Sequence, residues 1–186
     1  AYGATVQLAT PTSCLVVHLV RGSGGYSNSC VSILKAVLED EDYVKAGCGV
    51  DLDLANLYEI WGHFDAKSRF DLVTVVPATP MTLSNQTKRG GWNQSGLQSL
   101  SRSLFGVHLP KSQRHIQTNW SDVPLSNKQV VYAARDAWAG AAIANTLAEY
   151  DPKCFGRDVL VDLFRQTETP VSSLVKRRQQ SRRAQA

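Results

Sequence analysis

The first two apolar segments of the chain are separated by only four residues, and this spacing constrains the fold more than any other feature. Thr5–Ala9 and Cys14–Val20 flank the turn-forming residues Thr10-Pro11-Thr12-Ser13. Parallel strands need a crossover of about a dozen residues or more, whereas a short turn joins antiparallel strands. The two segments therefore predict a β-hairpin, and any sheet that contains them has antiparallel pairing.

Beyond the hairpin, segments with a helical spacing of apolar residues alternate with shorter apolar runs. We expect helices from Ser29 to about Asp40, from Asp51 onward, from Leu97 to Gly106, from Ser126 to about Tyr150 and from Asp158 to Gln166. Ser29, Asp51 and Ser126 are the expected N-cap residues. A strand is expected at Tyr43–Gly49, and Phe70–Val76 has the composition of either a strand or a helix. This alternation predicts an α/β fold in which helices flank a mixed sheet.

Two polar segments interrupt this alternation. Pro77–Gly96 is longer than the usual connection between elements, which predicts an insertion or a working loop. Lys111–Ser121 is a basic loop in which Lys111 and Arg114 could contact phosphate, with an ordinary solvated loop as the alternative. Trp120 could either anchor this loop by packing or stack on a base, and we favour packing.

The positive charge of the chain lies at its C-terminal end. The net charge is +4, and residues 171–186 contain five basic side chains and no acid. Without those five, residues 1–170 carry −1, so the body of the chain argues only weakly for a nucleic-acid-binding surface. We divide the chain into a domain over residues 1–168 and a basic tail over 169–186. We expect the tail to be disordered, and its cations to be a nuclear-localisation signal, a phosphate-binding arm or a solvated end.

The signals that are missing point to an intracellular protein. No run approaches the roughly 18 apolar residues of a membrane span, and no signal peptide opens the chain. Cys14, Cys30, Cys48 and Cys154 form no Cys-x-x-Cys pair, which argues against a structural zinc site. We expect reduced cysteines, no membrane association and an intracellular location, with the nucleus favoured.

The longest expected helix contains the pattern with the most chemical information. Tyr132 and Asp136 are four residues apart in Tyr132-Ala133-Ala134-Arg135-Asp136, so they share one helical face. Their neighbours are mostly alanine, which lets another backbone come close. Taken alone, the spacing favours a tyrosine at the edge of the core and a solvated aspartate.

Asp53 is the second candidate, because it lies where the strand expected at Tyr43–Gly49 gives way to a helix. Carboxylates at such strand ends often gather in the active sites of α/β folds. The alternative is that one of Asp51 and Asp53 caps the helix while the other is solvated. Without further information, capping is the better interpretation.

Several motifs occur together and in a recognisable order between Ala4 and Asp151. They are Ala4-Thr5-Val6-Gln7-Leu8-Ala9 with Cys14-Leu15-Val16-Val17, Val44-Lys45-Ala46-Gly47-Cys48-Gly49-Val50 with Asp53-Leu54, Gly96-Leu97-Gln98-Ser99-Leu100 with Leu104-Phe105-Gly106, and Asn119-Trp120-Ser121, Pro124-Leu125-Ser126 and Tyr132-Ala133-Ala134-Arg135-Asp136-Ala137-Trp138. In this order they resemble the DEDDy 3′–5′ exonucleases, most closely the Werner-syndrome-type exonuclease domain and more distantly ribonuclease D.

The resemblance implies a ribonuclease-H-like fold and hydrolysis of nucleotides from the 3′ ends of nucleic acids, with DNA favoured over RNA as the partner. It also implies two divalent metal ions, Mg²⁺ or Mn²⁺, which would clamp the attacking and leaving oxygens. Asp136 would bind the ion beside the attacking water, Tyr132 would orient that water, and Asp53 would hold the second ion.

One part of the family pattern is missing. Family members carry an Asp-x-Glu motif on a strand before those found here, and no acidic residue precedes Glu39. Because that strand is central in the family's sheet, we expect the sequence to be incomplete at its N-terminus. As it stands, the chain should bind metal weakly and catalyse poorly or not at all. The alternative is a non-catalytic nucleic-acid-binding or scaffold module on the same fold.

Overall fold

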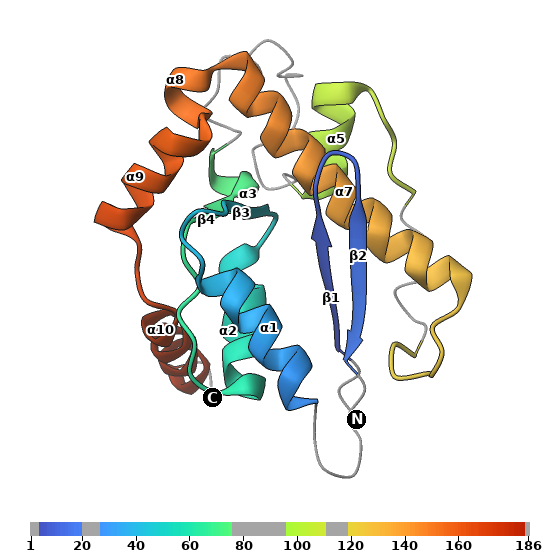
Figure 1. The fold of residues 1–186 in the computed structure, drawn as a ribbon, viewed down its shortest axis with the longest axis vertical. Coiled ribbons are helices and arrows are strands. Elements are labelled where there is room, and N and C mark those ends of the chain that lie inside the picture. The colour runs from blue at the N-terminus through green and yellow to red at the C-terminus, as the bar shows by residue number, and fades with distance from the viewer. Residues whose placement is uncertain (1–3, 20–26, 76–95, 111–118, 185–186) are drawn as a thin grey trace. The chain divides into compact units, whose positions relative to one another are not determined.

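A computed structural model describes residues 4–19, 27–75, 96–110 and 119–184 (Figure 1). The chain forms two compact units. The first comprises Ala1–Ser27 and Leu72–Thr146, and the second comprises Asn28–Asp71 and Leu147–Ala186. No helix within the described residues is both long enough and apolar enough to cross a membrane.

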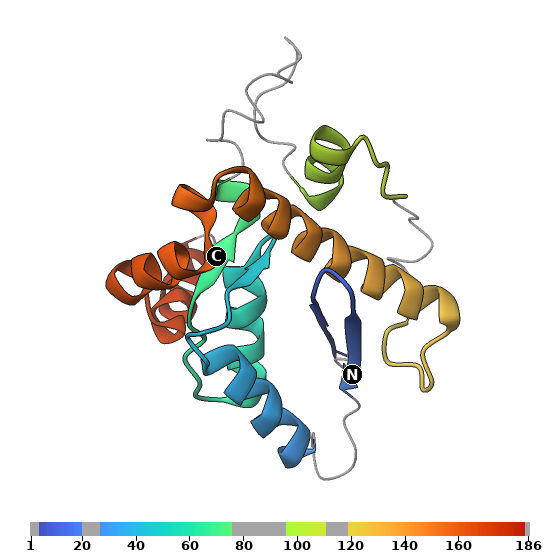
Figure 2. The ribbon, with the colours of Figure 1, turned by 45° about the horizontal axis from the view of Figure 1, so that its top comes forward.

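The first unit begins with the expected hairpin. Strands β1 (Ala4–Ala9) and β2 (Cys14–Leu19) pair in an antiparallel arrangement. The Thr10 amide donates a hydrogen bond to the Ser13 carbonyl at 2.8 Å, which closes the turn between them. Figures 1 and 2 show this hairpin alongside helix α7 (Asn127–Tyr150).

Two shorter helices of the first unit, α3 (Leu72–Val75) and α5 (Leu97–Phe105), precede α7 in the chain. Helix α5 ends as predicted, because Gly106 adopts a left-handed conformation with a φ of 66°. Helix α7 begins as predicted after Ser126. The Ser126 amide donates to Gln129 Oε1 at 2.8 Å, and the Gln129 amide donates back to Ser126 Oγ at 3.4 Å. This reciprocal pair is a capping box.

The second unit pairs its two short strands in parallel. Its elements are α1 (Asn28–Glu39), β3 (Lys45–Gly47), α2 (Val50–Trp61), β4 (Arg69–Asp71), α8 (Pro152–Phe155), α9 (Arg157–Thr167) and α10 (Val171–Ala184). β3 and β4 are hydrogen-bonded neighbours. The buried core cluster of this unit consists of Leu38, Leu54, Phe64, Ala66 and Val171.

The structure confirms the α/β class, and it differs from the expected sheet in one respect. Both strand orientations occur, but the described strands form two separate two-stranded sheets where we expected one mixed sheet. The ambiguous segment Phe70–Val76 contains both kinds of element, because β4 ends at Asp71 and α3 begins at Leu72. The backbone therefore changes from strand to helix within one apolar run.

The expected cap of helix α2 is wrong. Gly49 is the N-cap residue, with a φ of 80°, and Asp51 lies inside the first turn. There Asp51 Oδ1 accepts a hydrogen bond from Arg69 Nε at 2.9 Å. The carboxylate is engaged by a buried guanidinium from β4 and is not available to the helix amides. The cap expected at Ser29 is also wrong, because α1 starts at Asn28 and Ser29 lies inside the helix.

The expectation of a disordered tail is also wrong. Residues 171–184 form helix α10, which packs against α2. Val171 and Val175 are buried, and they lie one helical turn apart. Burial of this apolar stripe offsets the entropy lost when the segment becomes ordered. The second unit consequently continues past the boundary that we expected at residue 168.

The two polar segments fall largely outside the described residues. This applies to Pro77–Gly96, except for Gly96 itself, and to residues 111–118 of the basic loop. Lys111 and Arg114 are among them, so their contact with phosphate stays a prediction.

Candidate functional site

Tyr132 and Asp136 are joined by a hydrogen bond on helix α7. The Tyr132 hydroxyl donates to the Asp136 carboxylate one helical turn further along, and both side chains are half-buried. Partial burial raises the pKa of Tyr132, and the hydrogen bond to Asp136 and the charge of Asp136 raise it further. The phenol is therefore neutral at physiological pH and keeps its proton for donation.

The Asp136 carboxyl is in an environment that disfavours its charge. Partial burial raises its pKa above the usual value, although the hydrogen bond from Tyr132 and the positive charge of Arg135 act in the opposite direction. The positive charge of Arg135 thus stabilises the ionised form of the carboxylate. A half-buried carboxylate with a raised pKa is typical of a functional site, although ion-pair networks also produce such shifts.

The loop before α7 holds Tyr132 from the other side. The rings of Trp120 and Tyr132 lie 6.2 Å apart between centroids at an angle of 54°. His18 Nε2, on strand β2, hydrogen-bonds the Trp120 carbonyl oxygen at 2.8 Å. Trp120 makes the contacts of a packing anchor, and stacking on a base stays a prediction.

Strand β2 and its turn also bind α7 directly, next to the Tyr132–Asp136 pair. Cys14 Sγ donates to the Ala134 carbonyl at 3.3 Å, and Trp138 Nε1 donates to the Pro11 carbonyl at 3.1 Å. The small side chains of α7 thus let the hairpin approach its backbone, as the alanine-rich sequence predicts. The hairpin fixes the segment of α7 that presents both candidate side chains.

Asp53 lies in the first turn of α2, in the second unit. The Gly49 carbonyl accepts hydrogen bonds from the amides of Leu52 at 3.0 Å and of Asp53 at 3.2 Å. Space at the turn is restricted, since a Cβ added at Gly47 would lie 2.8 Å from Val50 Cγ2. The two glycines of Gly47-Cys48-Gly49 thus allow a strand to turn directly into the helix that presents Asp53.

A further carboxylate, Asp71, belongs to this turn and was not singled out from the sequence. Asp71 Oδ1 accepts a hydrogen bond from the Gly49 amide at 3.2 Å. Desolvation raises the pKa of Asp53, and the negative charge of Asp71 raises it further. The available signal was that Asp71 ends an apolar run, because the ends of parallel neighbouring strands lie at one edge of a sheet.

The thiol of Cys48, in the same turn, keeps its proton at neutral pH. Burial, together with the charge of Asp71, raises the pKa of the Cys48 thiol to about 12. Only the thiolate is a strong nucleophile or metal ligand. Chemistry at this turn therefore depends on the carboxylates.

The donor atoms of the candidate residues fit a hard divalent cation. Asp53, Asp71 and Asp136 supply carboxylate oxygens, which Mg²⁺ and Mn²⁺ prefer. Desolvation raises the pKa of Asp53 and of Asp136, so a bound cation would compensate for hydration that each has lost. In the part of the chain that the structure describes, no three His, Cys, Asp or Glu side chains form a group that could hold a metal ion. Asp53 and Asp71 are thus a partial donor set within the second unit, and Asp136 is a single carboxylate donor within the first.

A family model described as 3′–5′ exonuclease matches residues 2–150. The chain belongs to the 3′–5′ exonuclease family. The match includes Asp53, Tyr132 and Asp136, and it confirms the resemblance found in the sequence. The α/β fold of the two units agrees with this membership.

Curated relatives carry the same activity in their names. A 3′–5′ exonuclease of Arabidopsis thaliana is 34% identical over 137 residues, which is 73% of this chain and 42% of that protein. The bifunctional 3′–5′ exonuclease/ATP-dependent helicase WRN of Mus musculus is 32% identical over 149 residues, or 77% of this chain and 9% of that protein. The chain thus spans less than half the length of either relative.

Similarity extends to a bacterial relative and to solved structures. Ribonuclease D of Gluconacetobacter diazotrophicus is 34% identical over 103 residues, which is 55% of this chain and 23% of that protein. The crystal structure of the EXD2 exonuclease domain soaked in Mn and GMP is 26% identical, with a TM-score of 0.32, over 82% of this chain and 74% of that chain.

Proposed function

We propose that the chain is the core of a metal-dependent 3′–5′ exonuclease that removes nucleotides from the 3′ ends of nucleic acids, with DNA favoured over RNA. The observation that carries this proposal is the Tyr132–Asp136 hydrogen bond on α7, within the residues matched by the exonuclease family. An isolated Tyr-x-x-x-Asp spacing means little, but in this family context the pair is a candidate for water activation. A nuclear location and a role in DNA repair belong to the same proposal, since both follow from DNA ends as substrate.

The proposed roles follow from the donor and acceptor capacity of each side chain. Asp136 would hold one divalent ion, Mg²⁺ or Mn²⁺, and Asp53 would hold a second. When bound, such ions lower the pKa of water and stabilise the charge that develops on the phosphate. Tyr132 donates its only proton to Asp136, so its oxygen lone pairs are left to accept a hydrogen bond from the attacking water. The water would thereby be aligned for attack on the last phosphodiester.

The acidic motif Asp-x-Glu of the family does not occur in the 186 residues of this chain. No acid precedes Glu39, so the Asp-x-Glu pair of the family is absent from it. We expect this chain alone to bind metal weakly and to turn over poorly or not at all. Where the natural protein extends beyond these residues and carries such a pair, the pair would supply the remaining ligands.

The second candidate is a non-catalytic nucleic-acid-binding or scaffold module on the same fold. Both candidates predict binding to nucleic acid. Only the exonuclease predicts that the full-length protein shortens a strand from its 3′ end.

A single assay separates the two. The full-length protein is incubated with a 5′-labelled duplex that has a recessed 3′ end, with Mg²⁺, Mn²⁺ or EDTA. A matched RNA strand gives the preference between DNA and RNA. The exonuclease produces a ladder that shortens one nucleotide at a time and disappears in EDTA. Binding without shortening in either metal would contradict the exonuclease and support the module.

A further inference from the structure

We infer that helix α10 is a second contact surface for the nucleic-acid substrate, and that Lys176, Arg177 and Arg183 bind phosphates of its backbone. The inference rests on the proposed function, because it assumes that the substrate is a nucleic acid. It assigns a role to the basic segment that is separate from the expected contacts of Lys111, Arg114 and Trp120.

Helix α10 is held on the second unit by its apolar stripe. Val171 is fully buried within the core cluster, and Val175 is buried one turn later. The Val171 amide donates to Asp65 Oδ1 at 3.1 Å, which ties the first turn of the helix to the segment after α2. The basic residues are therefore presented from a packed helix.

Two of the five cations complete this packing. Arg178 donates a hydrogen bond to Asn56 Oδ1 on α2, and Arg182 lies 3.9 Å from Glu59 of the same helix. With Val171 and Val175, these arginines follow the spacing of one helical face. That face is directed at α2.

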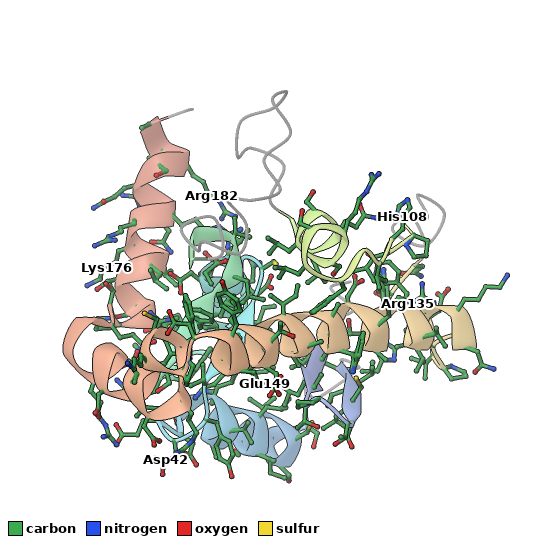
Figure 3. All side chains as sticks on the ribbon, turned by 90° about the horizontal axis from the view of Figure 1, so that it is seen from above. Asp42, His108, Arg135, Glu149, Lys176 and Arg182 are labelled. Atoms are coloured by element: carbon green, nitrogen blue, oxygen red, sulfur yellow. The ribbon has the colours of Figure 1, made fainter. Side chains whose placement is uncertain are left out.

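The other three cations project away from this face. Lys176, Arg177 and Arg183 are exposed, and no acid occurs between residues 171 and 184 to pair with them along the helix. Within the described residues, none of the three has an acidic partner closer than 4 Å. Figure 3 shows Lys176 and Arg182 leaving α10 on opposite sides.

The three exposed cations are arranged in a way that suits a polyanionic ligand. Lys176 and Arg183 are seven residues apart, which places them about 10 Å apart along one side of the helix. Cations held at such a spacing bind most favourably to a ligand with regularly repeated negative charges. A nucleic-acid backbone is such a ligand, and the counterions that it releases on binding add to the affinity. Because α2 carries both Asp53 and the partners of α10, the surface and this candidate metal ligand belong to one compact unit.

The test compares two triple variants of the full-length protein with equal loss of charge. The first is Lys176→Gln with Arg177→Gln and Arg183→Gln. The control is Lys153→Gln with Arg157→Gln and Arg165→Gln, which removes three exposed cations from other helices of the same unit. Fluorescence anisotropy in EDTA measures binding to a labelled duplex with a recessed 3′ end, between 50 and 200 mM salt.

For the α10 variant, we expect the slope of log K against log salt to become shallower by about 2 to 3, because each phosphate that a cation neutralises adds roughly 0.9 to the slope. The control should change the slope by less than about 1. Circular dichroism should show both variants folded, and the single variants Lys176→Gln and Arg183→Gln should each lower the slope by about 1. An unchanged slope in the α10 variant, or an equal change in the control, would overturn the inference.

Two further measurements separate this inference from its alternatives. Loss of binding to phosphatidylserine vesicles with unchanged binding to DNA would assign α10 to a membrane surface and overturn the inference. Hydrolysis of a nitrophenyl ester of thymidine 5′-monophosphate, which lacks the longer backbone, should be unchanged in the α10 variant. If the wild-type protein binds DNA but hydrolyses neither substrate, the exonuclease proposal fails while the salt slopes still decide the role of α10.

Discussion

The hydroxyl of Tyr132 donates a hydrogen bond to the carboxylate of Asp136, and this bond holds together the two residues of α7 to which we assign chemistry. Trp120 packs on Tyr132, and the hairpin binds the α7 backbone at Ala134, so the pair is fixed from two sides. The hydrogen bond distinguishes a positioned phenol from a tyrosine that only fills the edge of the core. Its removal should therefore affect chemistry more than stability.

Replacement of Tyr132 by Phe tests this distinction. The variant keeps the ring that packs on Trp120 and loses only the hydroxyl, so the melting temperature should change little. In the full-length protein, kcat should fall by about 100-fold, because misplacement of a reacting water has effects of that size. Tyr150→Phe is the matched control at the exposed end of the same helix. Equal activity in both variants would assign Tyr132 a structural role only.

Substitution of Gly49 should destabilise the protein because of the backbone conformation at this position, and the size of the new side chain should matter little. Its φ is 80°, and an added Cβ would meet no atom within 4 Å, so a substitution costs conformational energy and creates no clash. We expect Gly49→Ala to lower the free energy of unfolding by about 1 to 2 kcal/mol, and Gly49→Asn to lower it less. Urea denaturation measures both values. Two variants as stable as the wild type would show that the turn adopts another conformation.

Arg69 links β4 to the segment before α10 and should contribute strongly to stability. Its buried side chain donates to Asp51 Oδ1, to the Ala66 carbonyl at 2.6 Å and to the Thr169 carbonyl at 2.5 Å. Glu168 lies 3.6 Å away and has a side chain that is 11% exposed. Arg69→Met leaves this carboxylate without its cation, and we expect a loss of about 3 kcal/mol in urea denaturation.

The matched control for Arg69 is Arg165→Met. Arg165 bonds Glu41 at 2.9 Å, but its side chain is 47% exposed, so water screens the pair. The expected loss is below about 1 kcal/mol. Similar losses in the two variants would contradict the role assigned to the buried guanidinium.

Asp136 and Asp65 should respond to pH in opposite directions in the metal-free protein. Burial raises the pKa of Asp136, so the folded state holds this proton to a higher pH than the unfolded state does. Stability is then lost as the pH rises from the usual Asp value through the raised pKa. Asp136→Asn should remove that loss, and its melting temperature should exceed the wild-type value at pH 7 and approach it in acid.

For Asp65, burial acts to raise the pKa, but hydrogen bonds from Lys67 and from the Val171 amide lower it overall. Its stabilising contribution is present above the unfolded pKa and is lost as the pH falls through the lowered value. Asp65→Asn should therefore be less stable than the wild type at pH 7, and the difference should shrink in acid. Melting temperatures in EDTA from pH 3 to 8 check both variants, and the same sign for both would contradict these assignments.

Local patterns predicted those elements whose signals lie within a few neighbouring residues. The four-residue turn before Cys14, the cap at Ser126 and the left-handed Gly106 each depend on adjacent residues, and all three are confirmed. Asp51 failed as a cap because its partner, Arg69, comes from a strand 18 positions later. A pattern of neighbouring residues does not show that Arg69 competes with the helix amides for the Asp51 carboxylate.

The same reason explains what was missed in the site and in the tail. Asp71 meets the Gly49 amide only because β3 and β4 pair, and this pairing is a tertiary interaction. Val171 and Val175 form a short apolar stripe in a very basic segment, and only the surface of α2 makes that stripe sufficient for a helix. The sequence placed Tyr132 and Asp136 on one helical face because both lie on one helix, but it did not predict the hydrogen bond between them, since the spacing alone favoured a solvated aspartate.

The most direct test of the exonuclease assignment is the rate at which the full-length Asp136→Asn variant releases nucleotides in single-turnover reactions with Mg²⁺ or Mn²⁺. Asn keeps the size of the side chain and an acceptor for the Tyr132 hydroxyl, but it lacks the charge that holds a divalent ion. Asp158→Asn, which alters an exposed carboxylate paired with Arg157, is the control. We predict that the Asp136 variant binds the duplex but releases no nucleotides, while the control matches the wild type. Undiminished release by the Asp136 variant would contradict the assignment.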